Sequence, residues 1–170
     1  ILEFDFIPTS DSMEFRYAFG SAEYFAWENS SYNDVFGFFL SGPGISGPWA
    51  NGAINLAYIP NTNPQLPITI SSVNSVTPIN SQYFVDNQNG LSIIADADGF
   101  TTVLTAQALV QCGETYHIKL AIADGSDAAL NSYVWLEAGS FYSPPLSVVD
   151  DLSIDSTFMQ IPCNSTITLT

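Results

Sequence analysis

Apolar and polar residues alternate with a period of two along most of this chain, which is typical of β-strands with one buried face. The clearest case is segment 13–19, where large apolar side chains occupy every second position, at Met13, Phe15, Tyr17 and Phe19. Residues 101–110 and 116–122 repeat this alternation, and residues 1–7 follow it more loosely. Residues 35–40 form a continuous apolar run, which predicts a central strand covered on both faces.

Turn-forming segments separate these strands from further ones predicted at 53–59, 68–73, 134–137 and 139–141. Gly, Pro, Asn and Asp mark the turns at 41–48, 60–64, 87–90, 123–127 and 143–145. This organisation predicts an all-β fold, a two-sheet antiparallel β-sandwich with a jelly-roll-like arrangement. We expect an inward face made by Phe15, Tyr17, Phe36, Phe38, Ile118, Leu120 and Ile122. Residues 21–28 are the one competing signal, because their composition permits a turn or two of helix.

The best candidate domain boundary is the Ser-Pro-Pro segment at 143–145. We expect residues 1–143 to form the sandwich and residues 144–170 to be a final strand, a linker or the start of a neighbouring module. Because Ile1 already lies in a strand pattern, we also expect the sandwich to lack an upstream portion. An edge left open in this way would be filled by another segment of the parent protein or by a neighbouring subunit.

The charge of the chain is strongly one-sided. Seventeen Asp and Glu residues face only two basic ones, Arg16 and Lys119, and the net charge is −15. Nucleic acids and anionic membrane surfaces are excluded as natural partners, because both are bound by clustered Lys and Arg. No apolar run reaches the length of about 20 residues that a membrane-spanning helix needs. The two cations lie in strands, where Glu23 and Glu137 are the expected carboxylate partners.

The two cysteines, Cys112 and Cys163, permit a single disulfide and are too few for a zinc ribbon. In an oxidising extracellular environment they would close a loop of about 50 residues, worth a few kcal/mol in the chain-entropy model. Two buried free thiols are the alternative that the sequence leaves open.

Three groups of acidic and amide residues are candidate cation ligands, because Ca²⁺ prefers carboxylate, amide and carbonyl oxygens. One group is Glu23 with Asn33 and Asp34, the second is Asp124 with Asp127, and the third lies at 96–99. None of them has the spacing of an EF-hand loop. The alternative is that these side chains cap turns through local hydrogen bonds to the backbone.

Catalytic chemistry finds little support in the sequence. His117 lies in a strand between Tyr116 and Ile118, where a structural role is the commoner one, and no GxSxG, HExxH or phosphate-binding loop is present. Trp27 and Trp49 lie in loop-like segments and are candidate stacking platforms for a sugar. Trp135 is expected to face the core.

Several stretches of the chain together resemble the bacterial choice-of-anchor L domain family. They run in order from residue 1 to about residue 143, and the most specific are NDVFGFFLSGPG (33–44) and TYHIKLAIAD (115–124). The resemblance implies a secreted or surface-attached, adhesin-like protein with a C-terminal anchoring signal. Two positions depart from the family pattern: Ala22-Glu23 replaces an acidic pair, and Asn131-Ser132 replaces an Asp-Ser. A calcium site carried over onto Glu23, Asp34, Asp124 and Asp127 would therefore be weaker or differently completed.

We therefore expect a non-enzymatic extracellular module of a larger bacterial cell-surface or filament protein, with a role in adhesion or assembly and with calcium as its cofactor. Its expected partners are other segments of its parent protein, neighbouring subunits and surface glycans. The alternative is a carbohydrate-binding module or a polysaccharide-active enzyme, with Trp27 and Trp49 as the stacking residues.

Overall fold

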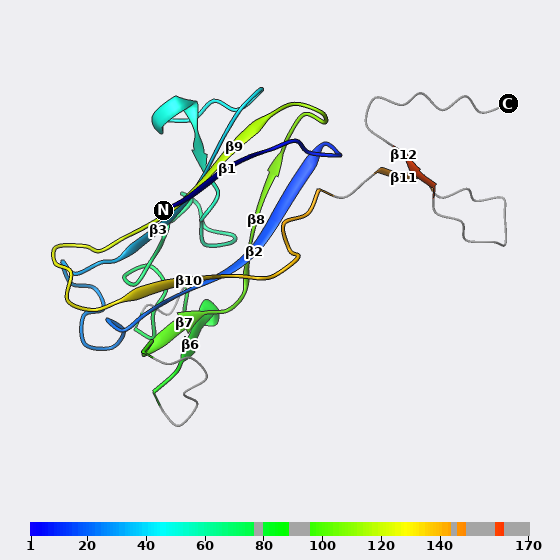
Figure 1. Ribbon diagram of the computed structural model, residues 1–170. Helices are drawn as coiled ribbons and strands as arrows, with labels where there is room; N and C mark the ends of the chain where they lie inside the picture. Colours follow the sequence, from blue (N-terminus) through cyan, green and yellow to red (C-terminus); the bar gives the residue numbers. More distant parts are fainter. Residues whose placement is uncertain (77–79, 89–95, 144–145, 149–158, 162–170) are drawn as a thin grey trace, which may run out of the picture.

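A computed structural model of the chain describes residues 1–76, 80–88, 96–143, 146–148 and 159–161. The predicted fold class is confirmed, because two five-stranded antiparallel sheets pack face to face as a β-sandwich (Figure 1). The buried side chains form one continuous core between the two sheets.

Sheet A has the strand order β1-β9-β3-β4, and β5 also pairs with β3. Its strands are β1 (Leu2–Phe6), β9 (Tyr116–Ala123), β3 (Val35–Ser41), β4 (Ile54–Asn55) and β5 (Ile68–Thr69). The register places Glu3 opposite Lys119 and Lys119 opposite Phe39, so these three residues form one row across the sheet. The next row on the same face of the sheet contains Asp5, His117 and Ser41.

Sheet B has the strand order β10-β2-β7-β6, and β8 pairs with the first part of β2. Its strands are β10 (Ser132–Leu136), β2 (Ser12–Ser21), β7 (Gly99–Thr101), β6 (Phe84–Asp86) and β8 (Leu104–Leu109). The long strand β2 carries the clean alternation seen in the sequence, with Met13, Phe15, Tyr17 and Phe19 all buried. It lies in the middle of this sheet, because β10 pairs with one of its edges and β7 and β8 pair with the other.

Two short 3₁₀ turns interrupt the sandwich, η1 (Ala50–Gly52) and η2 (Ser81–Tyr83). A separate antiparallel pair is formed by β11 (Leu146–Val148) and β12 (Met159–Ile161). Ser143 still belongs to the body of the sandwich, because its hydroxyl accepts the Thr9 N–H at 3.1 Å and donates to the Ser12 carbonyl at 2.9 Å. The domain boundary at 143–145 stays a prediction. So does the disulfide between Cys112 and Cys163, because Cys163 lies outside the described residues.

The predicted core residues lie inward. Six of the seven are fully buried and the seventh, Ile122, is partly buried against the core. The sequence predicts that the strand at 35–40 is covered on both faces, and for the outer face of β3 this is only partly met. The Phe39 ring covers Gly37, but Val35 remains 39% exposed.

The competing possibility of a helix at 21–28 is not realised, and the expectation for Trp135 is wrong. Residues 22–30 form a series of turns instead of a helix, and Phe25 adopts a positive φ of 68° that ends any helical run. Trp135 does not face the core, because Val134 takes the inward position and alternation turns the next side chain outward. Its indole lies over Gly20, where a Cβ would come within 2.6 Å of the ring.

Candidate functional site

Asp34 joins several segments at one end of the sandwich. Its carboxylate accepts hydrogen bonds from the Gly125 N–H at 2.8 Å and from the Ser132 hydroxyl at 2.6 Å, and its backbone carbonyl accepts one from Ile70. Gly125 is needed here, because a Cβ would lie 2.7 Å from the backbone oxygen of Asn33. Asp34 is fully buried. Its hydrogen bonds to Gly125 and Ser132 fasten the β9–β10 turn to the start of β3.

Glu23 is buried beside Asp34. The residue is only 2% exposed, and its Oε2 atom has no hydrogen-bond partner in the described structure. Burial raises the pKa of the Glu23 carboxyl from 4.5 to about 7, and the negative charges of Asp34 and Asp127 add to the rise. Glu23 is therefore about half protonated near neutral pH.

The predicted calcium ligands come together only in part. The side chains of Asn33 and Asp127 each accept a backbone N–H, at 3.0 Å and 3.3 Å, and Asp124 is exposed. Across the part of the chain that the structure describes, no three His, Cys, Asp or Glu side chains converge closely enough to hold a metal ion. Calcium binding stays a prediction. Local turn capping accounts for the hydrogen bond of Asp127 to Ala129, whereas Asn33 accepts the Ser71 N–H and so joins two segments 38 residues apart.

A second candidate site is organised by Trp49, on a loop that folds back on itself between β3 and β4. The Gly47 N–H donates to the Gly52 carbonyl at 2.7 Å, and the Trp49 N–H donates to the Ala53 carbonyl at 3.3 Å. A Cβ at Gly47 would lie 2.2 Å from the Ala53 oxygen, so glycine is required for this closure. The loop holds the indole 48% exposed above sheet A.

Trp49 forms one wall of a cavity of about 190 Å³ on the outer face of sheet A. Its ring contacts the Phe39 ring edge to face, with the ring centroids 5.2 Å apart. Phe39 in turn covers Gly37, which has no side chain to push the ring away. The rest of the lining mixes small, polar and charged residues: Glu3, Ser41, Ala50, Asn51, Ala53, His117 and Lys119.

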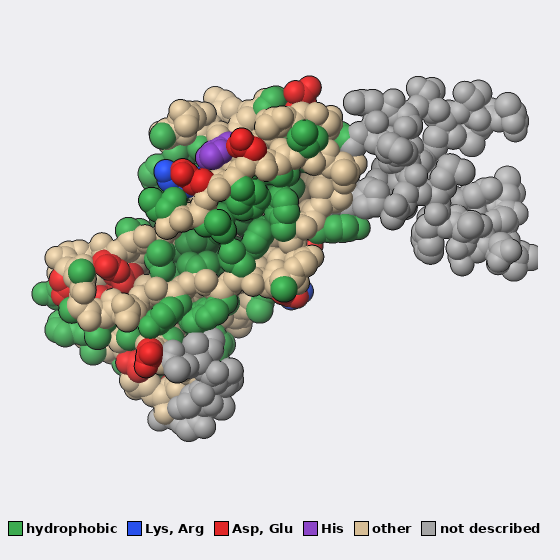
Figure 2. Space-filling model, viewed as in Figure 1, with side chains coloured by type: hydrophobic (Ala, Val, Ile, Leu, Met, Phe, Trp, Pro, Cys, Tyr) green, Lys and Arg blue, Asp and Glu red, His purple; other side chains and the backbone are tan. Residues whose placement is uncertain are grey.

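Polar side chains at this cavity pair with one another across β1 and β9. Lys119 Nζ lies 2.7 Å from Glu3 Oε1, and His117 Nδ1 lies 2.7 Å from Asp5 Oδ1. Hydrogen bonding to Lys119 lowers the pKa of the Glu3 carboxyl below its ordinary value. Figure 2 shows the basic, histidine and acidic side chains side by side on this part of the surface. Donors and acceptors therefore stand next to the aromatic wall.

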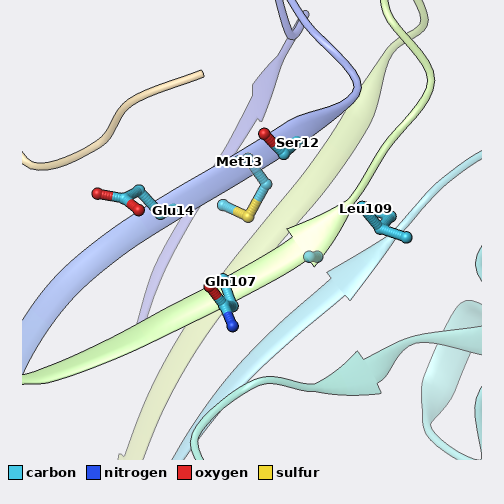
Figure 3. A pocket seen from close by; sticks show the side chains of 6 residues that line it. Ser12, Met13, Glu14, Gln107 and Leu109 are labelled. Atoms are coloured by element: carbon cyan, nitrogen blue, oxygen red, sulfur yellow. The ribbon is translucent and has the colours of Figure 1, made fainter. Parts of the chain in front are cut away.

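Two other hollows are weaker candidates. One of about 370 Å³ lies at β2 and β8, where Ser12, Glu14, Gln107 and Leu109 line it (Figure 3). Another, of about 620 Å³, lies beside β4 and β8 and includes the partly buried Tyr58. Neither combines an exposed aromatic ring with charged groups, which distinguishes the Trp49 cavity.

The other residues singled out in the sequence lie apart from this cavity. Trp27 is 42% exposed and contacts the Tyr32 ring, with centroids 4.9 Å apart. Arg16 forms an ion pair with Glu137 at 3.0 Å, which confirms that carboxylate as a partner. The expectation that Glu23 pairs with a cation is wrong, because Lys119 pairs with Glu3 instead.

Sequence reasoning named Trp49 but missed most of its surroundings. Glu3, Phe39 and Lys119 are more than 30 residues apart along the chain, and strand pairing alone brings them into one row. One sequence signal pointed to these surroundings: Glu3 and Lys119 both occupy outward positions in strands with alternating apolar and polar residues. The order of the strands, which the sequence pattern does not give, decides that they meet.

The sequence model of the choice-of-anchor L domain family matches residues 1–142. The chain belongs to this family. A choice-of-anchor L domain is a module of a larger cell-surface or secreted protein. No match was found among curated proteins or among solved structures. Among the described residues, no helix has the length and apolar character needed to cross a membrane.

The choice-of-anchor L match covers both candidate sites, the buried acidic cluster and the Trp49 cavity. It confirms the resemblance seen in the sequence and leaves the chemistry of the two sites to be argued from their geometry.

Proposed function

We propose that this choice-of-anchor L domain is a non-enzymatic adhesion module that binds carbohydrate in the Trp49 cavity. The observation that carries this proposal is the exposed indole beside the Lys119–Glu3 ion pair. A sugar ring presents an apolar face of C–H groups and a rim of hydroxyls. The C–H face can stack on the Trp49 indole, and the hydroxyls can bond to Lys119 as donor and Glu3 as acceptor.

The dimensions of the cavity favour a small ligand unit. Its volume of about 190 Å³ is below the ~300–1,000 Å³ that is usual for pockets that bury drug-sized molecules. A single monosaccharide unit at the end of a glycan, or exposed along it, fits such a space better than an enclosed oligosaccharide. The ion pairs also hold the polar groups in place before a ligand arrives, which reduces the entropy lost on binding.

Binding without turnover is part of the proposal. Glycoside hydrolysis uses one carboxylic acid with a raised pKa and a second carboxylate. At this cavity Lys119 lowers the pKa of Glu3, and Asp5 is held by His117. Glu3, the carboxylate that lines the cavity, is therefore suited to accept hydrogen bonds from hydroxyls and unsuited to donate a proton to a leaving group.

The test is a glycan array probed with the whole 170-residue chain, followed by titration of any bound glycan with tryptophan fluorescence as the readout. We expect Trp49→Ala to weaken binding at least tenfold. Trp27→Ala is the matched control, since it removes an indole of similar exposure from another loop, and it should leave the affinity within about twofold.

Three results would contradict the proposal. They are no binding to any glycan on the array, equal losses in the two tryptophan variants, or release of reducing sugar from a bound polysaccharide. The last result would favour the polysaccharide-active enzyme instead.

A further inference from the structure

Among the residues that the structure describes, one lateral side of the sandwich is open between two edge strands. β1 ends the strand order of sheet A, and β10 ends that of sheet B. Between them lies a groove of about 330 Å³ whose lining carries no charged side chain: Ile1, Leu2, Phe36, Leu120, Ala121, Ile122, Ser132, Tyr133, Val134 and Leu136. Figure 2 shows apolar side chains reaching the surface along this side. The core is therefore accessible here from solvent.

The two halves of this open side differ. At one half Phe141 fills the gap between the sheets, with its ring centroid 5.5 Å from that of Phe4, 5.0 Å from that of Phe6 and 5.5 Å from that of Phe15. At the other half the groove remains, although Phe36, in its lining, contacts the Tyr17 ring of sheet B; here Leu2 and Leu136 are 47% and 36% exposed. Burial of these exposed apolar side chains would favour binding of another polypeptide segment in the groove.

The edge of β1 specifies the chemistry of that occupant. Leu2, Phe4 and Phe6 point toward the core, and Glu3 and Asp5 point outward. Neighbouring residues on one face of a sheet interact as cross-strand pairs, and opposite charges are favourable there. A strand added beside β1 would place apolar side chains next to Leu2 and basic ones next to Glu3 and Asp5.

A second copy of this chain fits poorly. Two copies paired through β1 would bring Glu3 and Asp5 of both copies onto one face, and each copy carries a net charge of −15. Like charges in cross-strand positions are destabilising. The charge of the chain therefore favours a different partner.

We propose that an extended segment of a partner protein, with alternating apolar and basic residues, adds to the free edge of β1 and fills the groove between β1 and β10. Its backbone would pair with the exposed edge of sheet A, in the mode of strand addition. Its apolar side chains would cover Leu2, Val134 and Leu136, completing the open half as Phe141 completes the other. The groove itself shares no lining residue with the Trp49 cavity, although Glu3, on the outer face of β1, lines that cavity. The added strand would serve assembly.

The probe is a synthetic ten-residue peptide of alternating Val and Lys with blocked ends, titrated against the whole chain by fluorescence anisotropy at 0.5 M salt. A peptide of the same composition, with its five Val and five Lys in separate blocks, controls for simple charge attraction. We expect the alternating peptide to bind at least tenfold more tightly. Hydrogen exchange should slow at the amides of β1 when it binds.

Protein variants locate the contact. Leu2→Lys places a charge in the groove and should weaken binding of the alternating peptide at least tenfold. Leu109→Lys makes the same change at a site on β8 that is 82% exposed and should leave binding unchanged; circular dichroism confirms that both variants fold. Equal binding of the two peptides, protection confined to other strands, equal effects of the two variants, or a dimer whose contact protects β1 would each overturn the proposal.

Discussion

Two acidic regions of this domain balance their negative charge in opposite ways. On the outer face of sheet A, Glu3 and Asp5 are partly exposed and lie 2.7 Å from Lys119 and His117. At the end of the sandwich, Glu23 and Asp34 are buried, and no ion pair of either is found among the described residues. In the first region Lys119 lowers the pKa of the Glu3 carboxyl and so favours its charged form, whereas in the second burial raises the pKa of the Glu23 carboxyl and so favours its protonated form.

This contrast follows from the scarcity of cations. The chain has two basic residues and one histidine, and two of these three lie at the Trp49 cavity. Exposed ion pairs contribute little to stability, about 0–1 kcal/mol each. Under the proposed function the pair at the Trp49 cavity serves binding, whereas the buried acidic cluster bears on stability.

The largest effect is expected for Asp34→Ala. This change removes the acceptor for Gly125 and Ser132, and hydrogen bonds to charged groups contribute about 1.5–3 kcal/mol each. We expect the free energy of unfolding in urea to fall by about 4 kcal/mol. Asp127→Ala, on the exposed part of the same turn, should change it by less than about 0.5 kcal/mol. Equal effects of the two variants would show that Asp34 does not fasten this end of the sandwich.

The pH dependence of stability tests the proton on Glu23. Its folded-state pKa is raised to about 7 from 4.5, so between these values the folded state holds a proton that the unfolded state has lost. Stability should therefore fall as pH rises from about 4.5 to about 7 and then level off, a total change of about 3 kcal/mol.

Glu23→Gln should remove this fall, because glutamine is neutral at every pH, and the variant should be the more stable protein at pH 8. Urea unfolding at pH 5 and pH 8 measures the difference, with the exposed Glu114→Gln as control. A parallel decline in the wild-type and Glu23→Gln proteins would assign the pH dependence to other groups.

The effect of calcium on the melting temperature tests the buried acidic cluster in a third way. Above pH 7 the ionised Glu23 lies beside Asp34 and Asp127, and a divalent cation would replace the lost proton. At a calcium concentration ten times its Kd the gain would be about 1.4 kcal/mol, seen as a rise in the melting temperature that chelation reverses. The rise should be larger at pH 8 than at pH 5 and absent in Glu23→Gln. A melting curve indifferent to calcium and chelator at both pH values would reject the predicted site.

The smallest effect on stability is expected at the exposed ion pairs. Lys119→Met and Arg16→Met each remove one partner of a pair whose side chains are roughly half exposed, so each should cost less than about 1 kcal/mol. Carbohydrate affinity should separate them, since only Lys119 lines the cavity. Loss of affinity in both variants, or in neither, would show that the pair at the cavity has no special role.

The strand pattern of the core followed closely from the sequence. Alternation in 13–19 and 116–122 correctly placed most core residues, because a strand between two layers must turn every second side chain inward. The expectation for Trp135 was wrong, although alternation itself holds there, because Val134 takes the inward position. For 21–28 the sequence left a short helix open, and the positive φ of Phe25 belongs to a turn that composition does not reveal.

The candidate sites were predicted less completely. The sequence identified Glu23, Asp34 and Trp49 as unusual residues for their positions. It could not show that Asp34 has both oxygens occupied by the β9–β10 turn, or that Asp124 stays exposed. These outcomes depend on contacts between segments about 90 residues apart, and local patterns carry no information about them.

The sequence by itself determined the fold class, the acidic surface and the family, because alternation, charge and motifs are local properties of the chain. Only the tertiary structure decided which outward residues became neighbours. The order β1-β9-β3 brings Glu3, Lys119 and Phe39 into one row below Trp49, and the open side between β1 and β10 leaves an apolar groove. The physical reason is that strand order is set by packing of the whole core, and a site made from three strands exists only after that order is fixed.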